Sequence, residues 1–235
     1  MSKATSPDYA AIALLAYRQG LILRGGFYPR PEDKLPPLAN GGDCHTMILV
    51  GNAGQEMWTR FEQSPESRDG NPHPMNHWSE RIITAIAQEI GATVLFPFGG
   101  PPYLPFIQWA QRAEAVFSSP IGMLIHPTYG LWHAYRGALA LGQRIDLPSH
   151  CHTTTPCDSC ADKPCLSTCP VSAFSGSGYD VPQCVTHVSS SSGRDCMDGG
   201  CIARRACPVG TQYRYEPPQA RFHMVAFRAA QHAKR

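Results

Sequence analysis

Charged side chains are scarce in this sequence. Asp, Glu, Lys and Arg make up 16% of the 235 residues, against about 25% in an ordinary soluble domain. The 20 basic and 18 acidic residues nearly cancel to a formal net charge of +2, and Lys and Arg never form a run longer than a pair. A nucleic-acid-binding surface usually needs a basic patch, so the charge pattern argues against nucleic acid as a partner.

Long apolar segments are also lacking. No window approaches the run of about 18 apolar residues that a transmembrane helix needs, so we expect no membrane partner. The segment 1–27, MSKATSPDYAAIALLAYRQGLILRGGF, has Arg18 and Gln19 inside its apolar run. It has neither the basic start nor the small-residue cleavage site of a signal peptide. We therefore expect a cytoplasmic protein.

Cysteine is almost absent from the first 150 residues and crowded after them. Of the ten cysteines, nine lie between Cys151 and Cys207, and only Cys44 lies outside. In a reducing compartment such crowding indicates metal sites rather than disulfides. Residues 151–210 also contain few large aliphatic side chains, so an inorganic group is expected to replace an ordinary core. Cys44 and Cys151 are expected to be small buried apolar residues.

Three segments are predicted along the chain: a sheet domain over 1–150, a cysteine-rich domain over 151–215 and a C-terminal helix over 216–235. Hydrophobic periodicity in the first segment predicts helices at 8–19, 76–91 and 107–117, and strands at 45–54 and 92–98. The segment 122–142 predicts two strands around a turn. The last helix is expected to place Phe222, Val225 and Ala229 on its apolar face. This mixture predicts an α+β fold whose N-terminal sheet domain is α/β-like.

Two cysteine motifs end in Cys-Pro. The first is Cys157-x2-Cys160-x4-Cys165-x3-Cys169-Pro170, the second is Cys196-x4-Cys201-x5-Cys207-Pro208, and Cys184 lies between them. Bacterial ferredoxin runs have the spacing C-x2-C-x2-C-x3-C-P, and their fourth thiolate ligates the other cluster. By that logic one [4Fe–4S] cluster is held by Cys157, Cys160, Cys165 and Cys207. The other is held by Cys169, Cys184, Cys196 and Cys201. Two zinc sites of four thiolates each are the alternative.

The order of these parts resembles the epoxyqueuosine reductase and reductive dehalogenase superfamily. The resemblance is strong over 157–210, where a lone cysteine after YDVPQ separates the two motifs, and weaker over 76–142. It implies a nitroreductase-like first domain that binds cobalamin, followed by a ferredoxin-like double-cluster domain that delivers electrons to the cobalt. It also implies an external electron donor, a flavodoxin- or ferredoxin-type reductase.

The sequence departs from the family pattern in its first domain. Where epoxyqueuosine reductases have Asp-x-x-Pro-x-x-Glu, this chain has Pro102, Pro105 and Gln108, so the proposed proton-donating acid is missing. Ile125-His126-Pro127 replaces the family's Gly-Lys-Asn/His. The resemblance therefore implies the two-cluster electron-transfer module for this chain. It does not imply the family's substrate, so we do not expect tRNA as a substrate.

Candidate residues outside the cysteines lie in two loops. Tyr103 in GGPPYLPF and His126 in the turn HPTYG are candidate proton donors. The cofactor contacts are expected at His126, Pro127, Tyr129 and Gly130. For His126 the alternative is a histidine that only satisfies backbone groups in its turn, and for Tyr103 it is a packed loop aromatic.

Three functions fit these observations. The first is an oxidoreductase of the epoxyqueuosine reductase-like type that passes electrons through two clusters to a corrinoid, or failing that a flavin, held with its substrate by the first domain. The second is a ferredoxin-type carrier or assembly partner without small-molecule chemistry of its own. The third is a zinc-stabilised binding module. Arg204 and Arg205, between two cluster cysteines, are expected either to tune a potential or to be solvated.

Overall fold

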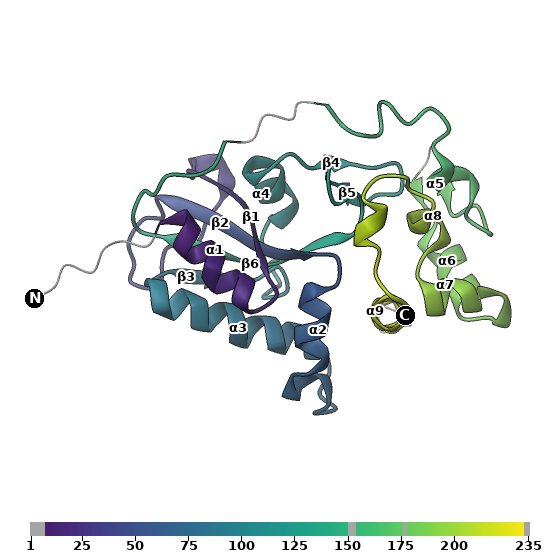
Figure 1. The fold of residues 1–235 in the computed structure, drawn as a ribbon, viewed down its shortest axis with the longest axis horizontal. Helices are drawn as coiled ribbons and strands as arrows, with labels where there is room; N and C mark the ends of the chain where they lie inside the picture. Colours follow the sequence, from purple (N-terminus) through teal and green to yellow (C-terminus); the bar gives the residue numbers. More distant parts are fainter. Residues whose placement is uncertain (1–7, 150–153, 176–177, 233–235) are drawn as a thin grey trace, which may run out of the picture. The chain divides into compact units, whose positions relative to one another are not determined.

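The computed structural model describes residues 8–149, 154–175 and 178–232 (Figure 1). These residues divide into two compact units. Residues 8–115 and 134–149 form what we call the sheet unit, and residues 116–133, 154–175 and 178–232 form the cysteine unit. Cys151, expected to be a buried apolar residue, lies outside the described residues. Within these ranges no helix is long and apolar enough to cross a membrane.

A four-stranded sheet in the order β1-β2-β6-β3 is the centre of the sheet unit. Its strands are β1 (Ile22–Phe27), β2 (Thr46–Ala53), β3 (Thr93–Leu95) and β6 (His133–Leu141). β1 is antiparallel to β2, and β3 is antiparallel to β6. Four helices accompany the sheet: α1 (Tyr9–Arg18), α2 (Glu56–Glu62), α3 (Pro74–Ile90) and α4 (Phe106–Ala113). Two 3₁₀ turns, η1 (Pro31–Asp33) and η2 (Pro65–Ser67), complete the unit.

Helix α3 shows how the sequence specifies this unit. Its isoleucines at 82, 83, 86 and 90 recur at helical spacing and are all buried. Gly91 ends the helix in the left-handed conformation, with φ 67°, and its N–H donates to Ala87 and Gln88 carbonyls. The helix begins at Pro74, two residues earlier than predicted, because Pro74 suits the first turn of a helix and His73 is the N-cap.

The cysteine unit consists of short elements. Two hairpins, β4 (Phe117–Ser118) with β5 (Leu124–Ile125) and β7 (Phe174–Ser175) with β8 (Gly178–Tyr179), are antiparallel. The helices are α5 (Pro164–Ser167), α6 (Val181–Val188), α7 (Arg194–Gly199), α8 (Ile202–Arg205) and α9 (Pro217–His232), with 3₁₀ turns η3 (Ser191–Gly193) and η4 (Thr211–Tyr213). The mixed helix and sheet content agrees with the predicted α+β class.

The predicted apolar face of the C-terminal helix is wrong. Val225 is 40% exposed and Ala229 is also exposed. The face of α9 that packs inward instead carries Ala220, Met224 and Phe227, and it lies against α7. Two faces of this helix each carry an aromatic and an aliphatic side chain, so hydrophobicity alone could not predict which face packs inward.

Candidate functional site

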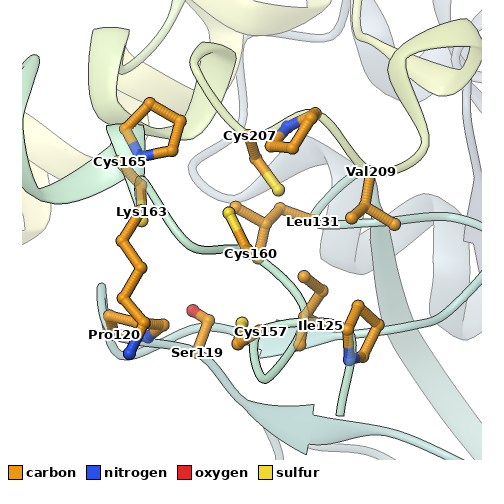
Figure 2. Close-up of a pocket in the computed structure, with 13 residues that line it drawn as sticks. Ser119, Pro120, Ile125, Leu131, Cys157, Cys160, Lys163, Cys165, Cys207 and Val209 are labelled. Carbon is orange, nitrogen blue, oxygen red and sulfur yellow. The ribbon is translucent and has the colours of Figure 1, made fainter.

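Cys157, Cys160, Cys165 and Cys207 line one hollow in the cysteine unit. Figure 2 shows their thiols arranged around a common space. The empty volume of the hollow is about 370 Å³, counting space open to solvent. Its walls are apolar: Ile125 and Leu131 are fully buried, and Pro208 and Val209 complete the rim. The structure therefore brings the last cysteine of the second motif to the first three cysteines of the first motif.

Short helices and tight turns position these four thiols. Lys163 adopts the left-handed conformation, with φ 38°, and starts α5, which carries Cys165. Helix α8 packs beside α5, and the N–H of Cys207 donates to the carbonyl of Arg204 at the end of α8. Pro208 cannot continue the helix, so the chain turns away after Cys207.

Cys169, Cys184, Cys196 and Cys201 form the second set. Cys184 lies in α6, Cys196 in α7, and Cys201 is the N-cap of α8. A negative charge on Cys169 would raise the pKa of both Cys184 and Cys201, which lie near it. Charge on Cys196 raises the pKa of Cys184, and charge on Cys201 raises that of Cys196. In the first set, charges on Cys157 and Cys160 raise the pKa of Cys165 and of Cys207.

Burial is the main influence on these thiols. It raises the pKa of Cys165, Cys184, Cys196, Cys201 and Cys207 above the usual 9.0. Neighbouring thiolates raise these pKa values further, because each added negative charge disfavours the next. As free thiols these five cysteines are therefore protonated near neutral pH, and binding of a metal group must release their protons.

Each set is embedded in apolar side chains. Ile121, Ile125, Leu131 and Ala203 pack with Cys157, Cys165 and Cys207 of the first set and also with Cys169 and Cys201 of the second. Val188 and Met197 pack with Cys184 and Cys196. A larger apolar hollow, with an empty volume of about 840 Å³, reaches Cys184 and Cys201. The side chains that enclose it come from β5–β6, the β7–β8 hairpin and α9, and are mainly Met123, Trp132, Phe174, Tyr179, Met224 and Phe227. Such a shell limits solvent access to a redox group.

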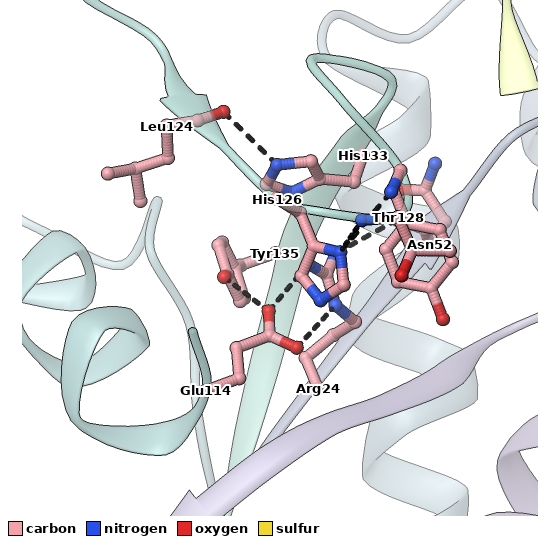
Figure 3. Close-up of polar contacts among 9 residues, drawn as sticks. Arg24, Asn52, Glu114, Leu124, His126, Thr128, His133 and Tyr135 are labelled. Carbon is pink, nitrogen blue, oxygen red and sulfur yellow. Dashed lines mark hydrogen bonds and ion pairs between the residues drawn. The ribbon is translucent and has the colours of Figure 1, made fainter. Parts of the chain in front are cut away.

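The turn between β5 and β6 belongs to the same unit and carries the predicted cofactor contacts. Figure 3 shows His126 Nδ1 accepting the N–H of Thr128, at 3.0 Å; it also accepts that of Tyr129, at 3.2 Å. The His126 ring stacks on Tyr129 with centroids 4.4 Å apart. Gly130 has φ 57°, and a Cβ there would lie 1.9 Å from the Val209 carbonyl oxygen. The turn thus packs directly against the loop after Cys207, with Pro127 half-buried.

The remaining candidates are Tyr103, Arg204 and Arg205. Tyr103 is 68% exposed at the surface of the sheet unit. Arg204 is held inward, since its Nη2 donates to the Leu131 carbonyl at 2.6 Å and its guanidinium lies 4.3 Å from the Trp132 ring. Arg205 pairs with Asp195 at 2.7 Å.

Sequence reasoning missed a buried polar group in the sheet unit. Arg24 of β1 is fully buried and pairs with Glu114 at 2.5 Å (Figure 3). The hydroxyl of Tyr135 in β6 donates to Glu114 at 2.6 Å, and burial raises the pKa of Tyr135 well above its usual 10.0. The pair joins residues 90 positions apart, so no local pattern could have revealed it.

Comparisons with known proteins identify the fold. No family model and no curated protein sequence matches the chain. Among solved structures it is similar to epoxyqueuosine reductase from Streptococcus thermophilus, with a TM-score of 0.54 and 16% identity over 90% of this chain and 69% of that one. It also matches the B12-trafficking protein CblC from C. elegans, with a TM-score of 0.49 and 14% identity over 93% and 95% of the two chains. The first likeness confirms the mixed helix-and-sheet fold.

Proposed function

We propose that this chain is a cytoplasmic iron–sulfur redox protein with two [4Fe–4S] clusters. Cys157, Cys160, Cys165 and Cys207 would hold the first cluster, and Cys169, Cys184, Cys196 and Cys201 the second. The clusters pass single electrons from an external flavodoxin- or ferredoxin-type reductase to an acceptor bound by the protein. The observation that supports this proposal is that Cys207 of the second motif lines the same hollow as Cys157, Cys160 and Cys165 of the first, as the crossed ferredoxin pattern requires.

The donor chemistry of both sets fits an iron–sulfur cluster. Such clusters are held by four cysteine thiolates in a shielded pocket, and each set supplies four thiols within an apolar shell. The clusters supply one-electron transfer when bound. The protein's part is to keep the thiols converging, exclude water through side chains such as Ile125 and Leu131, and release the thiol protons on loading.

The order of the cysteines in the sequence favours clusters over zinc. Zinc sites of four thiolates also use C-x2-C pairs, but they do not need a repeated Cys-Pro or a crossed pattern, both of which belong to the ferredoxin spacing. The zinc-stabilised module is therefore the weaker alternative. In the described part of the chain, no group of three or more His, Cys, Asp or Glu side chains is arranged to hold a metal ion.

The acceptor is proposed to be a corrinoid, ahead of a flavin. This rests on the resemblance of the sequence, supported by the fold likeness to epoxyqueuosine reductase. We assign His126, Pro127, Tyr129 and Gly130 as contacts of the acceptor, because their turn ends in Leu131, which lines the first hollow. The two hydrogen bonds that His126 Nδ1 accepts keep the ring proton on Nε2, the atom that would donate to the acceptor.

A carrier without its own chemistry is the second candidate. Two observations favour it: the family's acid is replaced around Pro102 to Gln108, and Tyr103 lies exposed in that same loop. In that case the sheet unit would serve as a docking surface for a protein partner.

The test is anaerobic reconstitution followed by cobalamin titration. The reconstituted protein is expected to contain about eight iron and eight sulfide per chain and to show the broad visible absorption of such clusters. Saturable binding of added cobalamin, with a shift of the cobalt absorption bands, would establish the corrinoid enzyme. Intact clusters without cobalamin or flavin binding would favour the carrier. A colourless protein that holds zinc and no labile sulfide would refute the proposal.

A further inference from the structure

Ser119 is held in the tight turn of a hairpin in the cysteine unit. Its N–H donates to the Met123 carbonyl at 2.8 Å, and its own carbonyl accepts the Gly122 N–H at 3.0 Å. These two bonds close the turn between β4 and β5, so the backbone groups of Ser119 are satisfied within the turn. Ile121 of the same turn is buried and packs in the core of the unit. The turn therefore fixes the point from which the Ser119 side chain projects.

The side-chain hydroxyl of Ser119 lies in the wall of the first hollow. Ser119 is 9% exposed, and its Oγ is buried with no hydrogen-bond partner among the described residues. Figure 2 shows this oxygen directed into the hollow that the four thiols line. Ser119 does not line the larger hollow that reaches Cys184 and Cys201. Any effect of this hydroxyl should therefore be confined to the first cysteine set.

The wall of the hollow offers this hydroxyl no acceptor, whereas a bound cluster would. Besides the cysteines, Lys163 supplies the other polar side chain among the described residues that line the hollow, and its exposed ammonium group can only donate. A buried hydroxyl without a partner is unfavourable, because it has given up its hydrogen bonds to water. The sulfur atoms of an iron–sulfur cluster accept hydrogen bonds, so a cluster in the hollow would satisfy Ser119.

We infer that the Ser119 hydroxyl donates a hydrogen bond to a sulfur atom of the first [4Fe–4S] cluster and raises the reduction potential of that cluster. This inference rests on the proposed function. Reduction adds one electron to the cluster and breaks no bond, so the added negative charge stays on its iron and sulfur atoms. A hydrogen-bond donor to sulfur stabilises that charge. The electron is then favoured on the cluster whose hollow includes Leu131, at the end of the turn assigned to the acceptor.

The test is a redox titration of the reconstituted full chain, followed by electron paramagnetic resonance. Ser119→Ala removes only the hydroxyl, and it is expected to lower the potential of the first cluster by about 59 mV, which is a tenfold change in a one-electron equilibrium, while the second cluster is unchanged. Cys207→Ala identifies the signals, because it removes a ligand of the first set alone. In pulsed measurements in heavy water, Ser119→Ala should also remove one exchangeable proton coupled to the reduced first cluster.

Ser167→Ala is the matched control. It removes a hydroxyl from α5 of the same unit, but this hydroxyl is exposed and already donates to the Pro164 carbonyl at 3.3 Å. Both potentials should therefore stay unchanged. A second pair of variants separates the hydrogen bond from packing, since Ser119→Thr keeps the hydroxyl and Ser119→Val has the same shape without it. The threonine variant should have the higher potential at the first cluster by about the same amount.

The outcomes separate this inference from the proposed function. Two clusters whose potentials and proton couplings do not respond to Ser119→Ala would overturn the inference and leave the proposed function standing. Equal potentials in Ser119→Thr and Ser119→Val, or a shift of the second cluster alone, would also overturn it. Absence of any cluster in the wild type would instead overturn the proposed function.

Discussion

Removal of Cys207 tests whether the two motifs exchange their last cysteines. Cys207 belongs to the second motif in the sequence, yet it lines the hollow of Cys157, Cys160 and Cys165. It is only 7% exposed and packs with Ile125 and Leu131. Cys207→Ala should therefore abolish the first cluster and leave the second, although its own motif supplies two ligands to the second.

The expected loss of iron follows from the proposal that each set of four cysteines holds one cluster. Iron should fall from about eight to about four per chain, and sulfide in parallel. Truncating a thiol to a methyl group in a packed core costs only about 1 kcal/mol, so any larger loss of stability in the cysteine unit of this variant comes from the missing cluster. Cys169→Ala should give the same stoichiometry through loss of the second cluster.

Double variants distinguish crossed sets from uncrossed motifs. Cys157→Ala with Cys207→Ala should lose no more iron than either change alone, because both residues lie in the first set. Cys196→Ala with Cys207→Ala should lose nearly all of the iron, because it breaks both sets. Retention of about four iron in the second combination would refute the crossed arrangement. Cys44→Ala is the control, since Cys44 lies in the sheet unit and its thiol donates to the Thr46 carbonyl.

Three further changes test the packing of the two units. Arg24→Met leaves Glu114 buried without its paired cation, so it should cost about 3–5 kcal/mol in urea unfolding, whereas combining it with Glu114→Leu should restore much of that loss. The hydrogen bond from Arg81 lowers the pKa of Glu66 from 4.5 to about 2. That shift corresponds to at most ~3 kcal/mol of folding stability. Because Arg81 is half exposed, solvent screening reduces the contribution to about 1–2 kcal/mol. That stability is present above the unfolded pKa and is lost as pH falls toward 2, so wild type and Glu66→Gln should differ in melting temperature near neutral pH and converge in acid. Gly130→Ala, at φ 57° and 1.9 Å from a backbone carbonyl, should destabilise the cysteine unit by more than about 1 kcal/mol, and unchanged thermal unfolding would contradict the packing of this turn.

The elements that the sequence predicted are those that local chemistry specifies. The isoleucine stripe and terminal glycine gave α3, and the uninterrupted apolar run gave β2, whose residues Met47 to Val50 are fully buried. Strand β1 was missed because its sequence, ILRGGF, does not alternate and contains a charged residue. Arg24 is tolerated there because Glu114 pairs with it from far along the chain and the Asn52 carbonyl accepts a hydrogen bond from it.

Motif spacing and the repeated Cys-Pro predicted two crossed sets of cysteines. The structure places Cys207 at one hollow with Cys157, Cys160 and Cys165, while the role of all eight cysteines as ligands stays a prediction. The apolar wall from Ser119 to Leu131 could not be read from them, because nothing in a cysteine motif indicates which distant segment covers it.

The two units differ in what makes their cores. The sheet unit has large buried side chains of its own, such as Trp78, Ile83 and Trp109. In the cysteine unit, the buried clusters are small groups, such as Ile121, Ile125 and Leu131 with Cys207 or Val188 and Met197 with Cys196, and further cysteines pack against them. If inorganic clusters fill the hollows at the cysteine sets, their binding energy is part of the folding energy of that unit alone. Removing iron with a chelator should then accelerate hydrogen exchange throughout residues 154–232 and leave β2 and α3 protected. Equal protection of both units in the iron-free protein would show that the cysteine unit has a sufficient core without its clusters.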